Sequence, residues 1–135
     1  MATDRPDFST VPINHLLGLE LRSLDRGSAT VAMRPGEPLT QEYGVVHGGV
    51  LATLADTAAV YALHPFLAPG ERMTSIELKV NFLAPATPAR GEVVATSAVV
   101  RRGRTIAVAR VDVRQADHQV LTGLFTTIIA AAERR

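Results

Sequence analysis

One apolar stretch limits the possible folds of this chain more than any other feature. It runs from Gly48 to His64 and reads GGVLATLADTAAVYALH. Around a helical wheel, only Thr53, Asp56 and Thr57 interrupt its apolar character. A helix that is apolar on every side must be buried by other elements, so the stretch predicts one long buried helix.

Asp56 is the one charge in the middle of this predicted helix. Aspartate is a poor helix former, and moving an ionised carboxylate out of water costs several kcal/mol unless it is paired or hydrogen-bonded. Its neighbours one turn away on the helix surface are mostly small: Ala52, Thr53, Ala59 and Val60. They leave room for a ligand to approach the carboxylate, so the arrangement suggests a pocket.

Two glycines, Gly48 and Gly49, open the predicted helix directly after His47. The first backbone N–H groups of a helix have no partner inside it, and they attract negative charge. Taken alone, the glycines are explained by a tight entry turn, and Asp56 by a neighbouring hydroxyl or N–H that binds its carboxylate. Occurring in one helix, the two features favour a functional site.

The rest of the chain is almost entirely strand-like. Residues 1–12 are expected to form a flexible or extended arm, and residues 13–17 a short helix. Alternating apolar and polar residues predict about six strands, over residues 19–24, 29–34, 74–83, 91–100, 105–114 and 120–130.

The predicted strand over residues 74–83 has two faces of different character. The apolar face carries Ile76, Leu78, Val80 and Phe82. Because successive side chains of a strand point to opposite sides, the other face carries Ser75, Glu77, Lys79 and Asn81.

The order of the elements indicates the fold class. Two strands, one long helix and four further strands joined by short turns predict an α+β fold with an antiparallel sheet. The 135 residues are expected to form one domain, because a chain of this length buries about two thirds of its unfolded surface around a single core. Only one helix is available to cover the sheet, so a sheet curved around this helix buries more of it than a flat sheet.

The composition excludes several kinds of site. The absence of cysteine excludes disulfides, thiolate metal sites and a cysteine nucleophile, and it fits a reducing compartment. His15, His47, His64 and His118 show no metal-ligand spacing, so neither a metal nor another cofactor is expected. A G-x-S-x-G segment is absent, and a serine triad is therefore unsupported.

The formal net charge of +1 and the small number of aromatic residues argue against nucleic-acid binding. The first residues lack the apolar core of a signal peptide, and the longest apolar stretch is too short and too interrupted to span a bilayer. We therefore expect a soluble, cytoplasmic protein that does not contact a membrane.

Three segments resemble a known family. The segment VHGGVLATLAD, from Val46 to Asp56, is similar to the signature of PaaI-like acyl-CoA thioesterases, which have the hotdog fold. Further matches are SIELKVNFLAPA over residues 75–86 and RRGRT over residues 101–105. The resemblance covers about residues 13–130. It implies a curved antiparallel sheet of about six strands wrapped around one long buried helix.

The resemblance also implies a reaction and the residues that perform it. An acyl-CoA thioester would be hydrolysed, with Asp56 as general base or nucleophile and the backbone N–H of Gly48 polarising the thioester carbonyl. Gln41, where many relatives have Asn, would place the substrate or the water, and Ser75 would hold the attacking water. His47 is expected to order the loop before the helix. Coenzyme A enters only as part of the substrate, so no separate cofactor is implied.

Substrate contacts are expected from two further groups of residues, again by resemblance. They are Gly49, Asn81, Phe82, Leu83 and Pro85, together with the turn formed by Arg101, Arg102, Gly103, Arg104 and Thr105. Arginine matches the geometry of phosphate groups, so we assign this turn, with the segment from Asn81 to Pro85, to the phosphates and adenine of coenzyme A. The alternative is an arginine-rich turn that is only solvated.

The spacing of Gly48 and Asp56 predicts a site shared by two chains. At about 1.5 Å per residue, their backbones lie about 12 Å apart along the helix axis. A thioester carbon must lie about 3 to 3.5 Å from the attacking atom while its oxygen touches the N–H donor. A twofold homodimer would place Gly48 of one chain opposite Asp56 of the other. The resemblance implies that two such dimers form a homotetramer.

Two alternatives stay open. One is a module that binds acyl-CoA or coenzyme A without turnover, in which Asp56 serves only helix packing. The other is a hotdog hydratase or dehydratase, although the Gly-Asp-x-Asn-Pro segment usual in those enzymes is absent. The identity of the acyl group is not predicted by the sequence.

Overall fold

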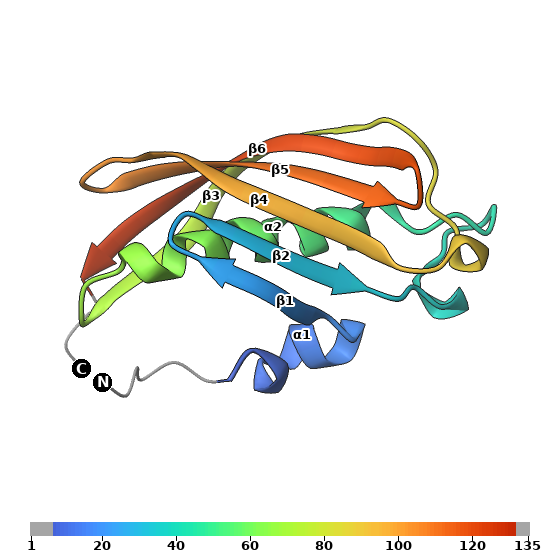
Figure 1. Ribbon diagram of the computed structural model, residues 1–135, viewed down its shortest axis with the longest axis horizontal. Helices are drawn as coiled ribbons and strands as arrows, with labels where there is room; N and C mark the ends of the chain where they lie inside the picture. Colours follow the sequence, from blue (N-terminus) through green and yellow to red (C-terminus); the bar gives the residue numbers. More distant parts are fainter. Residues whose placement is uncertain (1–6, 132–135) are drawn as a thin grey trace.

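An antiparallel sheet of six strands curves around one long helix (Figure 1). The computed structural model describes residues 7–131. The long helix is α2 (Gly48–Leu63), and the strands are β1 (Glu20–Asp25), β2 (Ser28–Met33), β3 (Glu71–Phe82), β4 (Val93–Arg102), β5 (Ile106–Gln115) and β6 (His118–Ala131). The short helical segments are η1 (Phe8–Thr10), α1 (Pro12–Leu17), η2 (Glu37–Leu39), η3 (His64–Phe66) and η4 (Pro88–Arg90).

The strand order is β1-β2-β4-β5-β6-β3, and every neighbouring pair is antiparallel. Although β3 follows α2 directly in the sequence, it lies at the far edge of the sheet, so β1 and β3 are the edge strands. The sheet does not close into a barrel, and α2 lies on its concave side (Figure 1). The predicted α+β hotdog fold, a curved antiparallel sheet around one long helix, is confirmed.

Small side chains let α2 lie close to the sheet. Ala55, Ala58, Ala59 and Ala62 are fully buried, and the helix packs mainly on β2, β4 and β5. Burial of apolar surface contributes about 25 cal/mol per Å² and is the main term that holds the helix in place. The buried hydroxyl of Ser97 in β4 donates to the carbonyl of Ala58 at 2.6 Å, which fixes the helix along its axis relative to the sheet.

The N-terminal segment differs from the expected arm where it is described. Residues 1–6 of that arm lie outside the described residues. Phe8 belongs to η1, and its ring centroid lies 4.7 Å from that of Tyr61 in α2, edge to face. Asn14 of α1 is buried and donates to the Phe8 carbonyl at 3.0 Å. This segment packs on the helix because the aromatic pair buries apolar surface that an extended arm would expose.

A β-bulge in β3 changes which side chains face the helix. The register shifts between Ser75 and Glu77. Before the shift Ser75 pairs with Thr127, after it Leu78 pairs with Phe125, and both partners are fully buried. Ser75 and Leu78 therefore lie on the same, helix-facing side. The predicted placement of Ser75 on the opposite face is wrong, because strict alternation does not continue through a bulge.

Candidate active site

Hydrogen bonds hold the entry to α2 in place. The His47 N–H donates to the Leu39 carbonyl at 2.9 Å, and the Val46 N–H donates to the Ala86 carbonyl at 2.8 Å. The His47 ring then caps the helix, because its Nδ1 accepts from the Gly49 N–H at 2.9 Å. The histidine thus orders the start of the helix.

This cap leaves the Gly48 N–H unused. Among residues 7–131, no group accepts a hydrogen bond from it. A Cβ at Gly48 would lie 3.0 Å from the Phe82 ring, and a Cβ at Gly49 would lie 3.0 Å from Nδ1 of His47, so both positions favour glycine. An N–H without an acceptor at a helix N-terminus is a ready donor to a group that carries negative charge.

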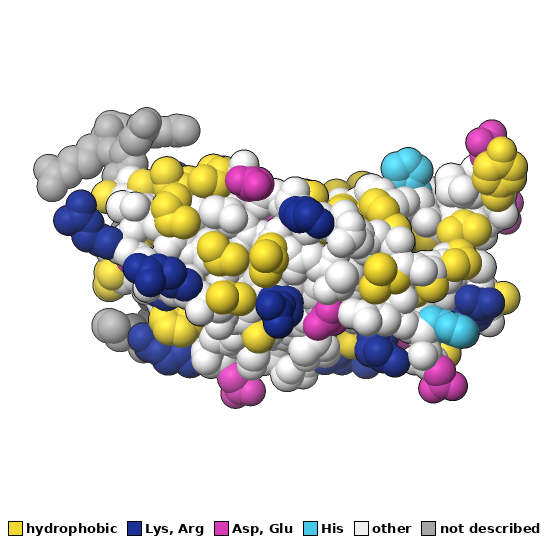
Figure 2. All heavy atoms as spheres, turned by 90° about the horizontal axis from the view of Figure 1, so that it is seen from above, with side chains coloured by type: hydrophobic (Ala, Val, Ile, Leu, Met, Phe, Trp, Pro, Cys, Tyr) yellow, Lys and Arg dark blue, Asp and Glu magenta, His cyan; other side chains and the backbone are white. Residues whose placement is uncertain are grey.

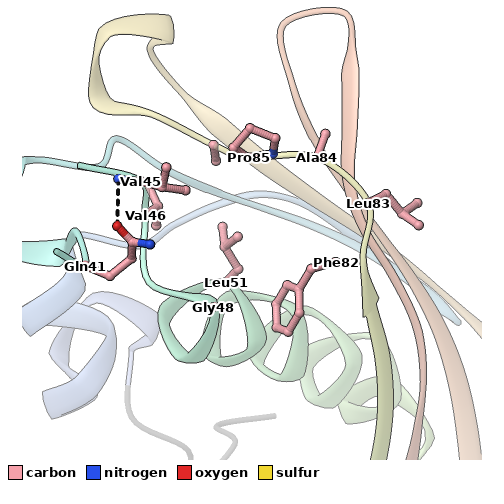
Figure 3. Close-up of a pocket in the computed structure, with 10 residues that line it drawn as sticks. Gln41, Val45, Val46, Gly48, Leu51, Phe82, Leu83, Ala84 and Pro85 are labelled. Carbon is pink, nitrogen blue, oxygen red and sulfur yellow. Dashed lines mark hydrogen bonds between the residues drawn. The ribbon is translucent and has the colours of Figure 1, made fainter. Parts of the chain in front are cut away.

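A cavity of about 430 Å³ lies beside this N–H group (Figure 3). Its lining is mainly apolar and consists of Gln41, Val45, Val46, Gly48, Leu51, Phe82, Leu83, Ala84, Pro85 and Ala86. Its volume falls in the range of small-molecule sites, about 300 to 1,000 Å³. Of the site residues expected from the sequence, the cavity brings together Gln41, Gly48, Phe82, Leu83 and Pro85.

Gln41 brings an amide side chain to this apolar lining. Its Oε1 accepts from the backbone N–H groups of Tyr43 at 2.5 Å and Val45 at 3.3 Å, which fixes the orientation of the amide. Its Nε2 points away from these two groups, toward the start of α2 (Figure 3). Within the described part of the chain nothing accepts from this Nε2, so the amide is available to donate to a carbonyl.

Asp56 and Ser75 form a second polar centre, in the middle of α2. The Ser75 hydroxyl donates to Oδ1 of Asp56 at 2.7 Å, and both residues are half-buried. A carboxylate with one hydroxyl donor keeps lone pairs available to take a proton. Opposite Ser75 in β6, the fully buried hydroxyl of Thr127 has no hydrogen-bond partner among the residues described.

The two centres are separated within one chain. Asp56 does not line the cavity that contains Gly48. Because both residues lie on α2, about 12 Å of helix axis separates them. A single thioester therefore does not reach both groups of the same chain.

The arginine turn lies at the end of the sheet remote from the cavity (Figure 1). The guanidinium of Arg102 is already engaged: it pairs with Glu71 at 3.5 Å and donates to the carbonyls of Gly103 and Arg104. Arg101 and Arg104 are exposed. These two side chains are the ones that the turn offers to a ligand.

Asn81 and Thr105 lie outside the cavity of their own chain. Asn81 is exposed and neighbours Phe82 in β3, so it points to the outer face of the sheet. Thr105 is exposed, and its carbonyl accepts from the Ile129 N–H at 2.7 Å.

The sequence does not predict the apolar residues that form the walls of the cavity. They include Val45, Val46, Leu51, Ala84 and Ala86. Val46, Ala84 and Ala86 directly flank predicted site residues, and Val45 and Leu51 lie two positions from one, so closeness in the sequence is the available signal. Apolar residues are common enough that this signal alone does not separate a cavity wall from ordinary core.

Residues 7–131 contain neither a candidate metal cluster nor a candidate membrane-spanning helix. No cluster of three or more His, Asp or Glu side chains in this range is arranged to hold a metal ion. No helix in the same range is long and apolar enough to cross a bilayer.

Known proteins similar to this chain point to one family. The Thioesterase superfamily model matches residues 43–122. The medium/long-chain acyl-CoA thioesterase YigI of Salmonella typhimurium is 30% identical over 132 residues, covering 87% of this chain and 84% of that protein. The 1,4-dihydroxy-2-naphthoyl-CoA hydrolase of Listeria monocytogenes is 27% identical over 123 residues, covering 91% of this chain and 98% of that protein.

A solved structure supports the fold. The PaaI protein from the phenylacetic acid degradation operon of Escherichia coli matches with a TM-score of 0.84 and 24% identity, covering 93% of this chain and 88% of that chain. The family model matches more than half of the residues of this chain. The strand order and the central helix agree with the hotdog fold. The chain therefore belongs to the thioesterase superfamily and has the hotdog fold of its PaaI-like members.

Proposed function

We propose that this protein hydrolyses acyl-CoA thioesters to a free acid and coenzyme A. The observation that carries the proposal is the Gly48 N–H, which has no acceptor among residues 7–131 and lies beside an apolar cavity. Thioester hydrolysis builds negative charge on the carbonyl oxygen, and a preorganised N–H donor stabilises that charge. The family supports the same reaction, since relatives in it are named as acyl-CoA thioesterases.

Asp56 supplies the second requirement of the reaction, a base or a nucleophile. As a base, its carboxylate takes a proton from water while the water oxygen attacks the thioester carbon. As a nucleophile, the carboxylate attacks the carbon itself and forms an anhydride, which water then hydrolyses. In both routes the C–S bond breaks and coenzyme A leaves as a thiolate. The Ser75 hydroxyl, 2.7 Å from Oδ1 of Asp56, is well placed to hold the water.

Each site then needs Gly48 of one chain and Asp56 of a partner. A twofold dimer supplies both, because the same contact made twice creates two identical sites. β3 is 12 residues long and lies at the edge of the sheet, where a free strand edge tends to pair with another strand. Ile76, Leu78 and Phe82 on this strand are 54%, 47% and 53% exposed, and a partner would cover them.

Pairing through β3 also brings the arginine turn of one chain close to Gly48 of its partner. The turn with Arg101 and Arg104 lies at the end remote from Gly48 (Figure 1). A twofold axis at β3 runs the two strands antiparallel, so the turn of one chain approaches the Gly48 end of its partner. The exposed arginines are then placed to bind the phosphates of coenzyme A while the acyl thioester occupies the cavity.

The proposal includes a tetramer of two such dimers in the cytoplasm. The outer face of the sheet carries Val100, Ile106, Leu124 and Ile128, whose exposed fractions lie between 39% and 58%. Figure 2 shows hydrophobic side chains among Lys and Arg on the face seen from above. Exposed apolar side chains of this kind support a second contact between copies. The absence of cysteine fits the reducing cytoplasm.

A panel of acyl-CoA thioesters tests the proposed reaction. A thiol reagent reports free coenzyme A, and calorimetry measures binding of the same ligands. The panel should hold medium-chain, long-chain and aromatic acyl groups, because the two relatives are named for such different substrates. We expect release of thiol from at least one member. Binding without release would favour the acyl-CoA-binding module instead, and hydration of an enoyl-CoA without release would favour the hydratase.

A further inference from the structure

A buried side chain from β5 holds the loop that forms one wall of the cavity. Gln115 is the last residue of β5 and is 1% exposed. Its Oε1 accepts from the Thr87 N–H at 3.0 Å, and its Nε2 donates to the carbonyls of Thr87 at 2.7 Å and Gly91 at 2.8 Å. The amide therefore bonds to both backbone groups of Thr87, as a neighbouring strand would.

The loop between β3 and β4 needs this support because most of it is irregular. It includes the short segment η4 and contains Pro85 and Pro88, which have no backbone N–H. Buried backbone groups outside regular structure must find other partners. An amide whose oxygen and nitrogen are both bonded has one favoured orientation, so Gln115 fixes the loop in one position.

The loop also helps to fix the start of α2, because the two segments are hydrogen-bonded to each other. Ala86, next to Thr87, is fully buried and lines the cavity. Its carbonyl accepts from the Val46 N–H at 2.8 Å. The chain of contacts thus runs from Gln115 through Thr87 and Ala86 to Val46, which directly precedes the His47 cap and Gly48.

We propose that Gln115 is a positioning residue for thioester hydrolysis. It does not line the cavity, but it sets the wall at Ala86 and the direction of the Gly48 N–H. The inference rests on the proposed function, because it concerns the same site. A residue that served only stability would leave the catalytic constants of the folded protein unchanged, whereas a positioning residue alters them.

Gln115→Leu tests this inference, because leucine fills similar space and makes none of the three hydrogen bonds. The matched control is Gln119→Leu on the same hairpin, since the Gln119 amide donates to Asp112 at 2.7 Å rather than to the loop. We expect Gln115→Leu to lower kcat/KM for an acyl-CoA about tenfold. Amide hydrogen exchange at Val46, followed by NMR, should become about tenfold faster. The control should change neither quantity.

Gln115→Glu keeps the test decisive if the leucine variant does not fold. The introduced carboxyl would be buried and would face the carbonyls of Thr87 and Gly91, and both effects raise its pKa. The protonated form can donate to one carbonyl and accept from the Thr87 N–H. The ratio of variant to wild-type kcat/KM should therefore rise as the pH falls from about 8 to about 5.5.

Two results would overturn the inference. One is a folded Gln115→Leu protein with wild-type kcat/KM and wild-type exchange at Val46. The other is a folded Gln115→Glu protein whose kcat/KM equals that of wild type at every pH from about 5.5 up to about 9.5, the pH at which the introduced carboxyl is ionised. A wild-type protein that releases no coenzyme A would refute the proposed function instead, and exchange at Val46 would still decide whether Gln115 controls the loop.

Discussion

Replacing Asp56 by Asn removes the carboxylate and changes little else. Asn is nearly the same size, and its side-chain oxygen can still accept the hydrogen bond that Ser75 donates to Asp56 at 2.7 Å. That bond weakens by about 1 kcal/mol when its acceptor is no longer charged. Asp56 is half-buried, so removing the charge also removes a desolvation cost. We expect the free energy of unfolding to stay within about 1 kcal/mol of wild type.

The expected effect of Asp56→Asn on turnover is much larger. A positioned general base contributes about 10² to 10⁴ in rate, or about 2.7 to 5.4 kcal/mol. The amide can neither take the proton from water nor act as the nucleophile, so kcat should fall at least about a hundredfold. KM should change far less, because Asp56 is assigned to the chemical step and not to substrate binding.

Steady-state release of coenzyme A measures this effect, and thermal unfolding checks the fold. Asp112→Asn is the matched control, because Asp112 also accepts from side chains, those of Gln119 and Thr122, but lies on β5 and not on α2. The control should keep wild-type kcat. A folded Asp56→Asn protein whose kcat stays within about threefold of wild type would refute the catalytic role of Asp56.

Two further predictions concern Thr127 and the arginine turn. Thr127→Val removes a buried hydroxyl that has no hydrogen-bond partner among residues 7–131, so it should raise the free energy of unfolding by about 1 kcal/mol. A lower Tm for the variant would show that the hydroxyl has a partner in the assembled protein. Arg104→Ala should raise KM for acyl-CoA but not for a short thioester without the nucleotide, whereas Arg102→Ala, which loses the pairing with Glu71, should mainly lower Tm. If Arg104→Ala affected both substrates equally, the turn would not bind the nucleotide.

The helix and the sheet could be predicted because their signals are local. The stretch from Gly48 to His64 is long enough for a helix and is apolar on nearly every side of it, and the strands show alternation over many residues. Local signals fail where backbone pairing decides the outcome. The bulge after Ser75 depends on the register of β3 with β6. It places the Ser75 side chain on the face of the sheet that covers α2, where it contacts Asp56.

The candidate site was harder to predict because distant segments build it. Gln41 and Gly48 can be predicted because they lie in one segment. The position of the cavity wall at Ala86 depends instead on its hydrogen bond with Val46 and on the hydrogen bond that Gln115 donates to Thr87 in the adjoining loop. Gln115 ends a strand and precedes a turn, so its sequence context resembles that of a solvated polar residue. Its burial follows from the packing of the loop between β3 and β4 over the end of β5.

Subunit mixing tests directly whether Gly48 of one chain works with Asp56 of another. Asp56→Asn keeps Gly48, whereas Gly48→Val keeps Asp56 and crowds the Phe82 ring, from which even a Cβ would lie 3.0 Å away. Each variant alone should be inactive. When equal amounts are refolded together, about half of the dimers are mixed and each of these has one intact site. A shared site predicts about a quarter of wild-type activity. Activity no higher than that of the separate variants, in a sample where mass spectrometry demonstrates mixed dimers, would contradict it.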